Sequence, residues 1–319
     1  MKQSIHTNHK IASQNKEAKS CTACWALLRV RTVAFCFAKQ GGFMSSLWTE
    51  NIEMPEFPTL EKDIRTQVLI IGGGMAGVLC AYFLQQAGVD YCLLEKDRIC
   101  QGVTGHTTAK ITAQHGLIYE KSLQSMGQER AELFLKANLR AVENYKNLGR
   151  FLDCDMEETD SYLYSVRERR KLESEIQALG SLGFQADYTE DTELPFEVEG
   201  AIRFPRQAQF QPLKFAAGIS KNLRIYEHSE VREMTEYFAL TEKGSVAAEK
   251  IIIATHFPFI NTRGSYYLKL YQNRSYVLAC AYGKNLKGMY LEADNIGLSL
   301  RNYEDYLLIG GGGHRSGKE

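Results

Sequence analysis

The apolar residues of this 319-residue chain fall into short runs with two kinds of spacing. Residues 67–71 and 91–94 are continuous, mostly apolar runs, which predict two buried strands. Residues 75–87 between them have the composition and spacing of a helix, and Gly88 ends it at the C′ position. A strand, a helix and a strand within 67–95 predict a βαβ unit with parallel strands.

The pattern changes further along the chain. A long helix is predicted over residues 128–148, and its core-facing side is expected to consist of Leu133, Phe134, Ala137, Val142, Tyr145 and Leu148. From residue 151 a short alternating strand, "SYLYSV", precedes a charged helix over 168–179, whose "RERRK" run is predicted to face solvent. Further strands or turns are predicted in residues 200–212, 223–226 and 237–254, with a helix over 212–221 and a buried run at 251–254.

The last part of the chain repeats short strands and turns, as an antiparallel sheet does. We therefore predict an α/β fold, α+β overall, in which a Rossmann-like βαβ domain is interleaved with a smaller antiparallel-sheet domain. The predicted division is a poorly structured leader over 1–43, a cofactor-binding domain over 44–150 and 209–262, and a substrate domain over 151–208 and 263–319. The segment "QGVTGHTTAKITAQHG", residues 101–116, is expected to be a loop too polar for the core.

Charge and hydropathy exclude two classes of partner. Lys plus Arg and Asp plus Glu both number 38, so no net field favours nucleic acid. The apolar stretch 25–38 is interrupted by Arg29 and Arg31, which leaves no run of the ~20 residues that a membrane span requires. Residues 1–43 also lack the pattern of a signal peptide, and an upstream start codon with Met44 as the functional start explains them.

Eight cysteines are scattered through a chain too long to need disulfides, which predicts reduced thiols and a cytoplasmic protein. Cys80 and Cys92 lie in apolar runs and are expected to fill the core. Cys21 and Cys24 have the spacing of half a zinc site, but no second pair follows at ligand spacing. No metal site is predicted.

The motif that indicates chemistry is the segment Gly72-Gly73-Gly74-Met75-Ala76-Gly77, which is G-x-G-x-x-G between a strand and a helix. Gly72 makes the tight turn, Gly74 lets the backbone approach a pyrophosphate, and Gly77 allows the helix to pack closely. Glu95 ends the second strand, where a carboxylate accepts both hydroxyl protons of an adenosine ribose. This combination predicts a site for an ADP moiety.

NAD and FAD share that moiety. An NAD-dependent dehydrogenase normally continues with alternating strands and helices, whereas residues 102–110 form a Gly/Thr-rich loop with hydroxyls and backbone donors suited to a flavin. We therefore favour FAD and keep an NAD-dependent dehydrogenase as an alternative.

The segments "TQVLIIGGGMAGVLCAYFLQQAGVDYCLLEKDRICQGVTGHTTAKIT", "RFPRQAQFQPLKFAAGI" and "KIIIATHFPFIN" resemble the FAD-dependent oxidoreductases of the D-amino-acid oxidase and glycine oxidase (DAO) family. Within it they resemble a bacterial branch that often carries a C-terminal Rieske domain. The resemblance extends from about residue 48 to the end of the chain.

This resemblance implies a set of cofactor-binding positions. The fingerprint approaches the pyrophosphate, Glu95 takes the ribose, the loop lines the diphosphate and flavin, Lys110 lies near the isoalloxazine, and the backbone of Val231 meets adenine. His256 replaces the glycine that usually follows Ala-Thr in related proteins, so the position after Thr255 departs from the family's pattern of close backbone approach. The positions assigned to FAD are Gly72, Gly74, Met75, Ala76, Gly77, Glu95, Gly102, Thr104, Thr107, Thr108, Lys110, Val231 and Thr255.

The family resemblance also implies a reaction, in which flavin N5 accepts a hydride from a carbon that bears an amine. The expected substrate is a small amine or amino acid, and the expected electron acceptor is oxygen or an iron–sulfur protein. No dedicated general base is required if the amine arrives neutral, so no catalytic residue is assigned. No G-x-S-x-G elbow supports hydrolysis.

Substrate contacts are expected from the second domain, where an arginine would hold a carboxylate through two parallel hydrogen bonds. The histidines beside the loop, His106 and His115, act near the ring or bind loop backbone. The candidates in the second domain are Arg274, Tyr276, Tyr290, Arg301, His314 and Arg315.

The end of the sequence, "LLIGGGGHRSGKE", comes before the closing segment and the Rieske ligands that the resemblance leads us to expect. A C-terminally truncated product is therefore expected, with no iron–sulfur cluster of its own. The second reading of this chain is accordingly a non-catalytic remnant that binds FAD weakly or not at all.

Overall fold

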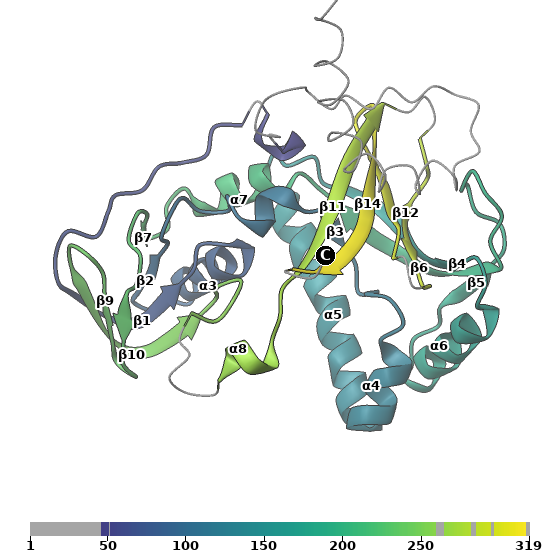
Figure 1. The fold of residues 1–319 in the computed structure, drawn as a ribbon, viewed down its shortest axis with the longest axis horizontal. Coiled ribbons are helices and arrows are strands. Elements are labelled where there is room, and N and C mark those ends of the chain that lie inside the picture. The colour runs from purple at the N-terminus through teal and green to yellow at the C-terminus, as the bar shows by residue number, and fades with distance from the viewer. Residues whose placement is uncertain (1–45, 51, 260–264, 282–284, 295–296, 317–319) are drawn as a thin grey trace, which may run out of the picture.

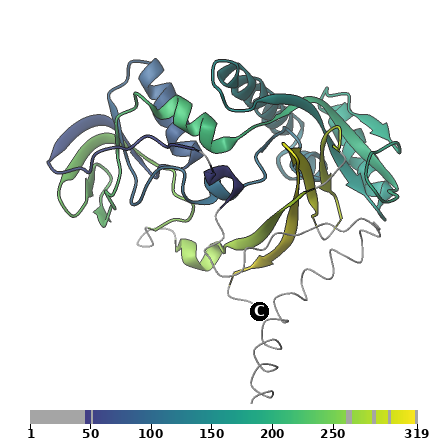
Figure 2. The ribbon, with the colours of Figure 1, turned by 90° about the horizontal axis from the view of Figure 1, so that it is seen from above.

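The computed structural model describes residues 46–50, 52–259, 265–281, 285–294 and 297–316. Within these residues the chain forms two β-sheets side by side, each covered by helices (Figure 1, Figure 2). The predicted leader, with Cys21, Cys24 and Met44, lies outside the described residues. The predicted α/β fold is confirmed, whereas the division of the chain into domains stays a prediction.

The first sheet contains six described strands in the order β7-β2-β1-β10-β9-β8. Its central strand β1 pairs in parallel with β2 and with β10, and β2 pairs in parallel with β7. Strands β9 and β8 extend this sheet in antiparallel pairing. The bounds are β1 Ile64–Ile71, β2 Tyr91–Leu94, β7 Ile225–Tyr226, β8 Glu233–Met234, β9 Phe238–Leu240 and β10 Ser245–Ile253.

Helices α3 (Met75–Gln86) and α7 (Pro212–Ser220) cover one face of this sheet. Val78 and Ala81 of α3 are completely buried in the same apolar cluster as Ile70 of β1 and Phe215 of α7. Gly88 has φ +68°, so it ends α3 in the left-handed conformation that glycine tolerates best. The predicted βαβ unit and its C-terminal glycine are confirmed.

The second sheet runs β11-β14-β13-β12-β4-β6-β3, with β5 paired to β6. Most of its pairs are antiparallel, as predicted, but β12 pairs in parallel with β4. These two strands come from distant parts of the chain, so no hairpin fixes their relative direction. The bounds are β3 Lys110–Ile111, β4 Glu157–Ser165, β5 Asp187–Thr189, β6 Gly200–Gln209, β11 Asn273–Ala281, β12 Met289–Glu292, β13 Ser299–Tyr303 and β14 Tyr306–Arg315.

Helices α4 (Tyr119–Met126), α5 (Gln128–Gly149) and α6 (Arg169–Ser181) pack against this second sheet. Tyr119, Leu135 and Leu172, one from each helix, share an apolar cluster with Leu163 of β4 and Phe204 of β6. Short elements complete the described chain: η1 (Leu47–Thr49), η2 (Val103–His106) and α8 (Tyr266–Lys269). Within the described residues no helix has both the length and the apolar content needed to cross a bilayer.

Three predictions about burial are wrong, one for a loop, one for a strand and one for helix α5. Residues 101–116 are not excluded from the core, since Ala109, Ile111 and Ala113 lie in the main apolar cluster. The run 251–254 is only partly covered, with Ile253 48% exposed. A continuous apolar run indicates a strand, but it does not say which of its faces the fold will cover.

The buried side of α5 also differs from the predicted one. Leu133 is 61% exposed and Phe134 37%, whereas Lys146 is 5% exposed. The sequence pattern excluded Lys146 because a charged group is rarely buried alone. In the fold Nζ of Lys146 lies 2.6 Å from Glu143 Oε1 and 2.7 Å from Glu158 Oε2, and these partners make its burial possible.

Candidate functional site

The glycine motif forms the turn between β1 and α3. Gly72 has φ +107°, and a Cβ atom there would lie 2.8 Å from the carbonyl oxygen of Ala254. A Cβ atom on Gly77 would lie 1.9 Å from the carbonyl oxygen of Gly72. The first turn of α3 therefore packs directly on the loop, and only glycine permits both close approaches.

Helix α3 begins directly after this turn. Its N-cap is Gly74, whose residue type offers no side chain to cap the helix. Ala76 in the first turn is exposed, and the N–H of Met75 donates to Thr104 Oγ1 at 3.1 Å. Backbone N–H groups and the positive end of the helix dipole make such a turn suited to a diphosphate.

The carboxylate of Glu95 lies against the glycine loop. Its Oε2 accepts a hydrogen bond from the N–H of Gly73 at 2.6 Å, and its Oε1 accepts one from the N–H of Asp97 at 3.0 Å. The residue is half-buried at the end of β2. The structure thus brings Glu95 and the glycine motif together, and the cradle fits the ADP half of a dinucleotide.

Val231 and Thr255 adjoin this cradle from two other segments. The N–H of Ser229 donates to the carbonyl of Glu95 at 2.8 Å, which brings the chain before β8 alongside β2. Val231 is 8% exposed and packs in the apolar cluster of the first sheet. The N–H of Ala254 donates to Ile71 at 2.8 Å, so Thr255 follows directly beside Gly72.

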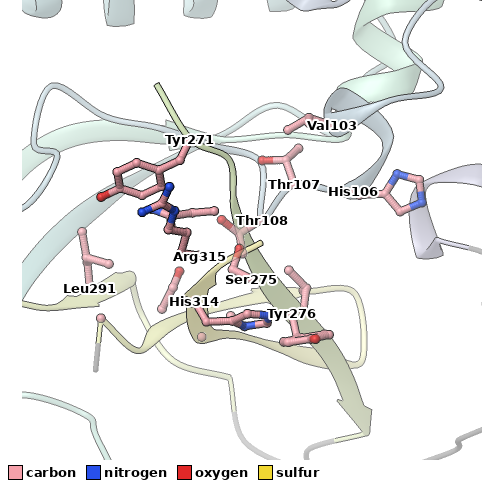
Figure 3. A pocket seen from close by; sticks show the side chains of 17 residues that line it. Val103, His106, Thr107, Thr108, Tyr271, Ser275, Tyr276, Leu291, His314 and Arg315 are labelled. Atoms are coloured by element: carbon pink, nitrogen blue, oxygen red, sulfur yellow. The ribbon is translucent and has the colours of Figure 1, made fainter. Parts of the chain in front are cut away.

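The loop that follows Glu95 carries the remaining assigned positions. The carbonyl of Gly102 accepts from the N–H of Gly105 at 3.1 Å and lies 2.9 Å from Nδ1 of His106. His106 thus binds loop backbone, which is one of the two roles predicted for it. Thr107 and Thr108 face an open cavity of about 870 Å³ between this loop and strands β11 and β14 (Figure 3).

The cavity has one formally charged side chain among its lining residues, Arg315. The Arg315 guanidinium lies 4.6 Å from the centre of the Tyr271 ring, and His314 stacks on Tyr276 at 5.8 Å. Figure 3 shows Arg315 next to Tyr271 and His314 next to Tyr276. Of the predicted substrate contacts, the structure therefore places Tyr276, His314 and Arg315 at the cavity.

Arg274, Tyr290, Arg301 and His115 do not line it. Tyr290 is 1% exposed and stacks on Tyr162 at 4.9 Å. Arg301 is also 1% exposed, and its guanidinium donates to main-chain carbonyls, among them those of Thr108 and Phe210. Arg301 is therefore a core residue and does not line the cavity as a substrate contact would.

Lys110 lies behind the cavity wall. Its Nζ donates to the carbonyl of Tyr290 at 2.6 Å. Removal of the ammonium group from water, and secondarily the nearby Arg301 guanidinium, lower the pKa of Lys110 to about 7. Whether Lys110 acts on the flavin stays a prediction.

Trp48 is a contact of this loop that the sequence analysis did not predict. Its indole N–H donates to the carbonyl of Thr107 at 2.6 Å, and its ring is 3% exposed. The two residues are 59 positions apart, so no local pattern could have revealed the contact.

Comparisons with known proteins show which family this sequence resembles. The family model described as DAO, FAD dependent oxidoreductase, matches residues 67–319. YhfW of Bacillus subtilis strain 168, described as a Rieske 2Fe-2S iron-sulfur protein, is 33% identical over 300 residues, which are 88% of this chain and 58% of YhfW. Gamma-glutamylputrescine oxidoreductase of Escherichia coli K12 is 24% identical over 220 residues, 62% of this chain and 50% of that protein. The chain thus spans less than two thirds of each relative.

Solved structures show the same fold. Glycine oxidase from Geobacillus kaustophilus superposes with a TM-score of 0.61 at 17% identity, over 80% of this chain and 73% of that one. L-proline dehydrogenase from P. horikoshii gives a TM-score of 0.63 at 18% identity, over 82% and 72%.

Proposed function

Because this chain belongs to the DAO family of FAD dependent oxidoreductases, we propose that it uses FAD to oxidise a small amine or amino acid. Membership of the family favours FAD over the NAD alternative. The observation that supports the proposal most is the contact of Glu95 with Gly73 at the open N-terminus of α3. It brings the acid next to the glycine loop that would bind the diphosphate.

The residues of this chain would hold the cofactor in two places. Gly72, Gly74 and the first turn of α3 would approach the diphosphate, and the remaining lone pairs of the Glu95 carboxylate would accept from the ribose hydroxyls. Thr107 and Thr108 face the cavity in which the flavin and the substrate would meet. When bound, FAD supplies the acceptor for a hydride from the carbon next to the amine nitrogen.

The cavity lining favours a substrate with an anionic group. Arg315 presents a planar set of donors that suits a carboxylate, and the face of Tyr271 fixes its orientation. No Asp or Glu is among the lining residues, so no like charge opposes an anion there. An amino acid is therefore the preferred substrate class within the proposal.

Two further parts of the proposal concern the surroundings of the enzyme. The electrons would leave to oxygen or to an iron–sulfur protein, and the similarity to YhfW supports the second acceptor. A cytoplasmic location is supported by Cys80, Cys92, Cys100 and Cys154, which are free thiols.

The proposal is tested by titrating the purified protein with FAD. We expect a yellow protein with flavin absorbance bands, which bleach anaerobically with one member of a panel of amines and amino acids. A colourless protein that does not take up added FAD would favour the non-catalytic remnant instead.

Glu95→Gln tests the assignment of the ribose ligand. An amide keeps one acceptor but loses the charge, so FAD affinity should fall about tenfold, equivalent to about 1.4 kcal/mol. Asp97→Asn is the matched control, because its carboxylate is exposed and pairs with Lys96 at 3.4 Å. If both variants bind FAD as tightly as the wild type, Glu95 is not a ribose ligand.

A further inference from the structure

Two side chains donate hydrogen bonds to three successive carbonyls of the loop formed by residues 102–110. The carbonyl of Thr107 accepts from the indole of Trp48 at 2.6 Å. Nη1 of Arg301 donates to the carbonyls of Thr108 at 3.1 Å and Ala109 at 2.5 Å. Two side chains from other parts of the chain thus fix the backbone of residues 107–109.

This backbone has a conformation that its sequence does not favour. Ala109 has φ +53°, the left-handed region in which a Cβ atom meets steric hindrance. Such a residue persists only where its surroundings determine the conformation, and it is most common at functional sites. The bond from the N–H of Ala109 to Thr107 Oγ1, 3.1 Å, and the bond to Arg301 both support this conformation.

Trp48 and Arg301 are themselves firmly placed. The Arg301 guanidinium lies 5.5 Å from the ring centre of Trp48 and 5.7 Å from that of Tyr303. Trp48 and Tyr303 pack edge to face at 4.7 Å, and the side chain of Gln211 donates to the carbonyl of Trp48 at 3.0 Å. Both Trp48 and Arg301 are almost completely buried.

The same loop also faces the cavity. Thr107 and Thr108 line it, and Figure 3 shows both side chains at its wall. Strand β14 approaches the loop so closely that a Cβ atom on Gly310 would lie 3.0 Å from Thr108 Cγ2. A shift of residues 107–109 would therefore move the wall of the cavity itself.

We propose that Trp48 and Arg301 are positioning residues, which hold the backbone of residues 107–109, with Ala109 in the left-handed region, so that Thr107 and Thr108 are presented to the flavin. The inference rests on the proposed function, since it assumes that FAD occupies the cavity beside this loop. In this proposal Arg301 supports residues 107–109, and Arg315 is the arginine that would bind the anionic group of the substrate.

The experiment compares FAD with ADP in equilibrium titrations of the full chain. Trp48→Phe keeps an aromatic ring but loses the N–H donor. We expect its Kd for FAD to rise about fivefold, whereas its Kd for ADP, which reports on the glycine cradle alone, stays within about twofold. Arg301→Lys, which keeps the charge but loses the fork of donors, should show the same selective loss.

A second measurement separates positioning from packing. Glycine adopts the left-handed region freely, so in an Ala109→Gly background the effect of Trp48→Phe should shrink from about fivefold to under about twofold. A role in packing alone predicts the same loss in both backgrounds, and that result would overturn the inference.

The outcomes also distinguish this inference from the proposed function. A wild-type protein that binds neither FAD nor ADP contradicts the proposed function. A wild-type protein that binds FAD, with Trp48→Phe and Arg301→Lys binding it equally well, contradicts only the positioning role.

Discussion

At the residue scale, the second sheet contains two basic residues, Lys110 on β3 and Arg301 on β13, that have no carboxylate partner among the ion pairs of the described chain. Arg301 donates to main-chain carbonyls, and Lys110 donates to the carbonyl of Tyr290. Carbonyl dipoles compensate a buried charge less well than a carboxylate does. Arg301, and Lys110 when it is protonated, therefore raise the electrostatic potential near Thr108, which lines the cavity, and this suits an anionic ligand there.

Lys110→Met tests this environment through the pH dependence of stability. The pKa of Lys110 falls from 10.5 to about 7 in the folded protein, so between these values the unfolded chain binds more protons. Its contribution to the free energy of unfolding therefore rises with pH over this range. In urea unfolding, we expect the free energy of unfolding of Lys110→Met to exceed that of the wild type by the largest amount near pH 7. This excess should shrink towards pH 10. A difference independent of pH would show that the ammonium group remains in water.

At the element scale, helix α4 depends on a side chain from another helix. Its N-cap, Ile118, makes no side-chain cap hydrogen bond. The carboxylate of Glu175 on α6 accepts instead from the N–H groups of Ile118, Tyr119 and Glu120, at 3.0, 2.8 and 2.9 Å. A negative charge at this position also opposes the positive end of the helix dipole.

Glu175→Ala should therefore destabilise the protein strongly. One buried and two partly buried donors would lose their acceptor, and we expect the free energy of unfolding to fall by about 2–3 kcal/mol. Glu173→Ala is the matched control on the same helix, because its exposed pair with Arg169 at 3.0 Å contributes about 0.5 kcal/mol or less. Equal effects of the two substitutions in urea unfolding would contradict the capping role.

The elements themselves were largely predictable from the sequence. The apolar runs and glycines predicted β1, α3 and β2 with bounds close to those observed, because these signals are local. The buried face of α5 was not predictable in the same way. Its burial of Lys146 depends on Glu158 of β4, a partner that the fold supplies.

At the scale of the whole molecule, the proposed cofactor would join the two sheets. Its ADP half would lie in the cradle of the first sheet, and its flavin half would enter the cavity lined by β11 and β14. Loop residues 102–110 connect these two places. Trp48 of η1 and Arg301 of β13 donate hydrogen bonds to this loop. FAD should therefore stabilise the assembly of the two sheets, whereas ADP engages only one.

Thermal unfolding with each ligand checks this expectation. A ligand at 100 times its Kd adds about 2.7 kcal/mol to the free energy of unfolding. We expect FAD to raise the unfolding midpoint clearly more than ADP at the same concentration, because the flavin half adds contacts with the second sheet. Equal shifts for FAD and ADP would show that the flavin half gains nothing from the cavity.

The sequence by itself determined the βαβ unit, the glycine cradle and the identity of the acid beside it, since strand, turn and helix signals act within about 30 residues. Tertiary structure alone decided which groups Arg301, Trp48 and Lys110 contact. Arg301 has the residue type of a carboxylate ligand, yet the fold turns it towards the carbonyls of Thr108 and Ala109. These contacts span more than 190 positions of the chain, and no local spacing encodes them.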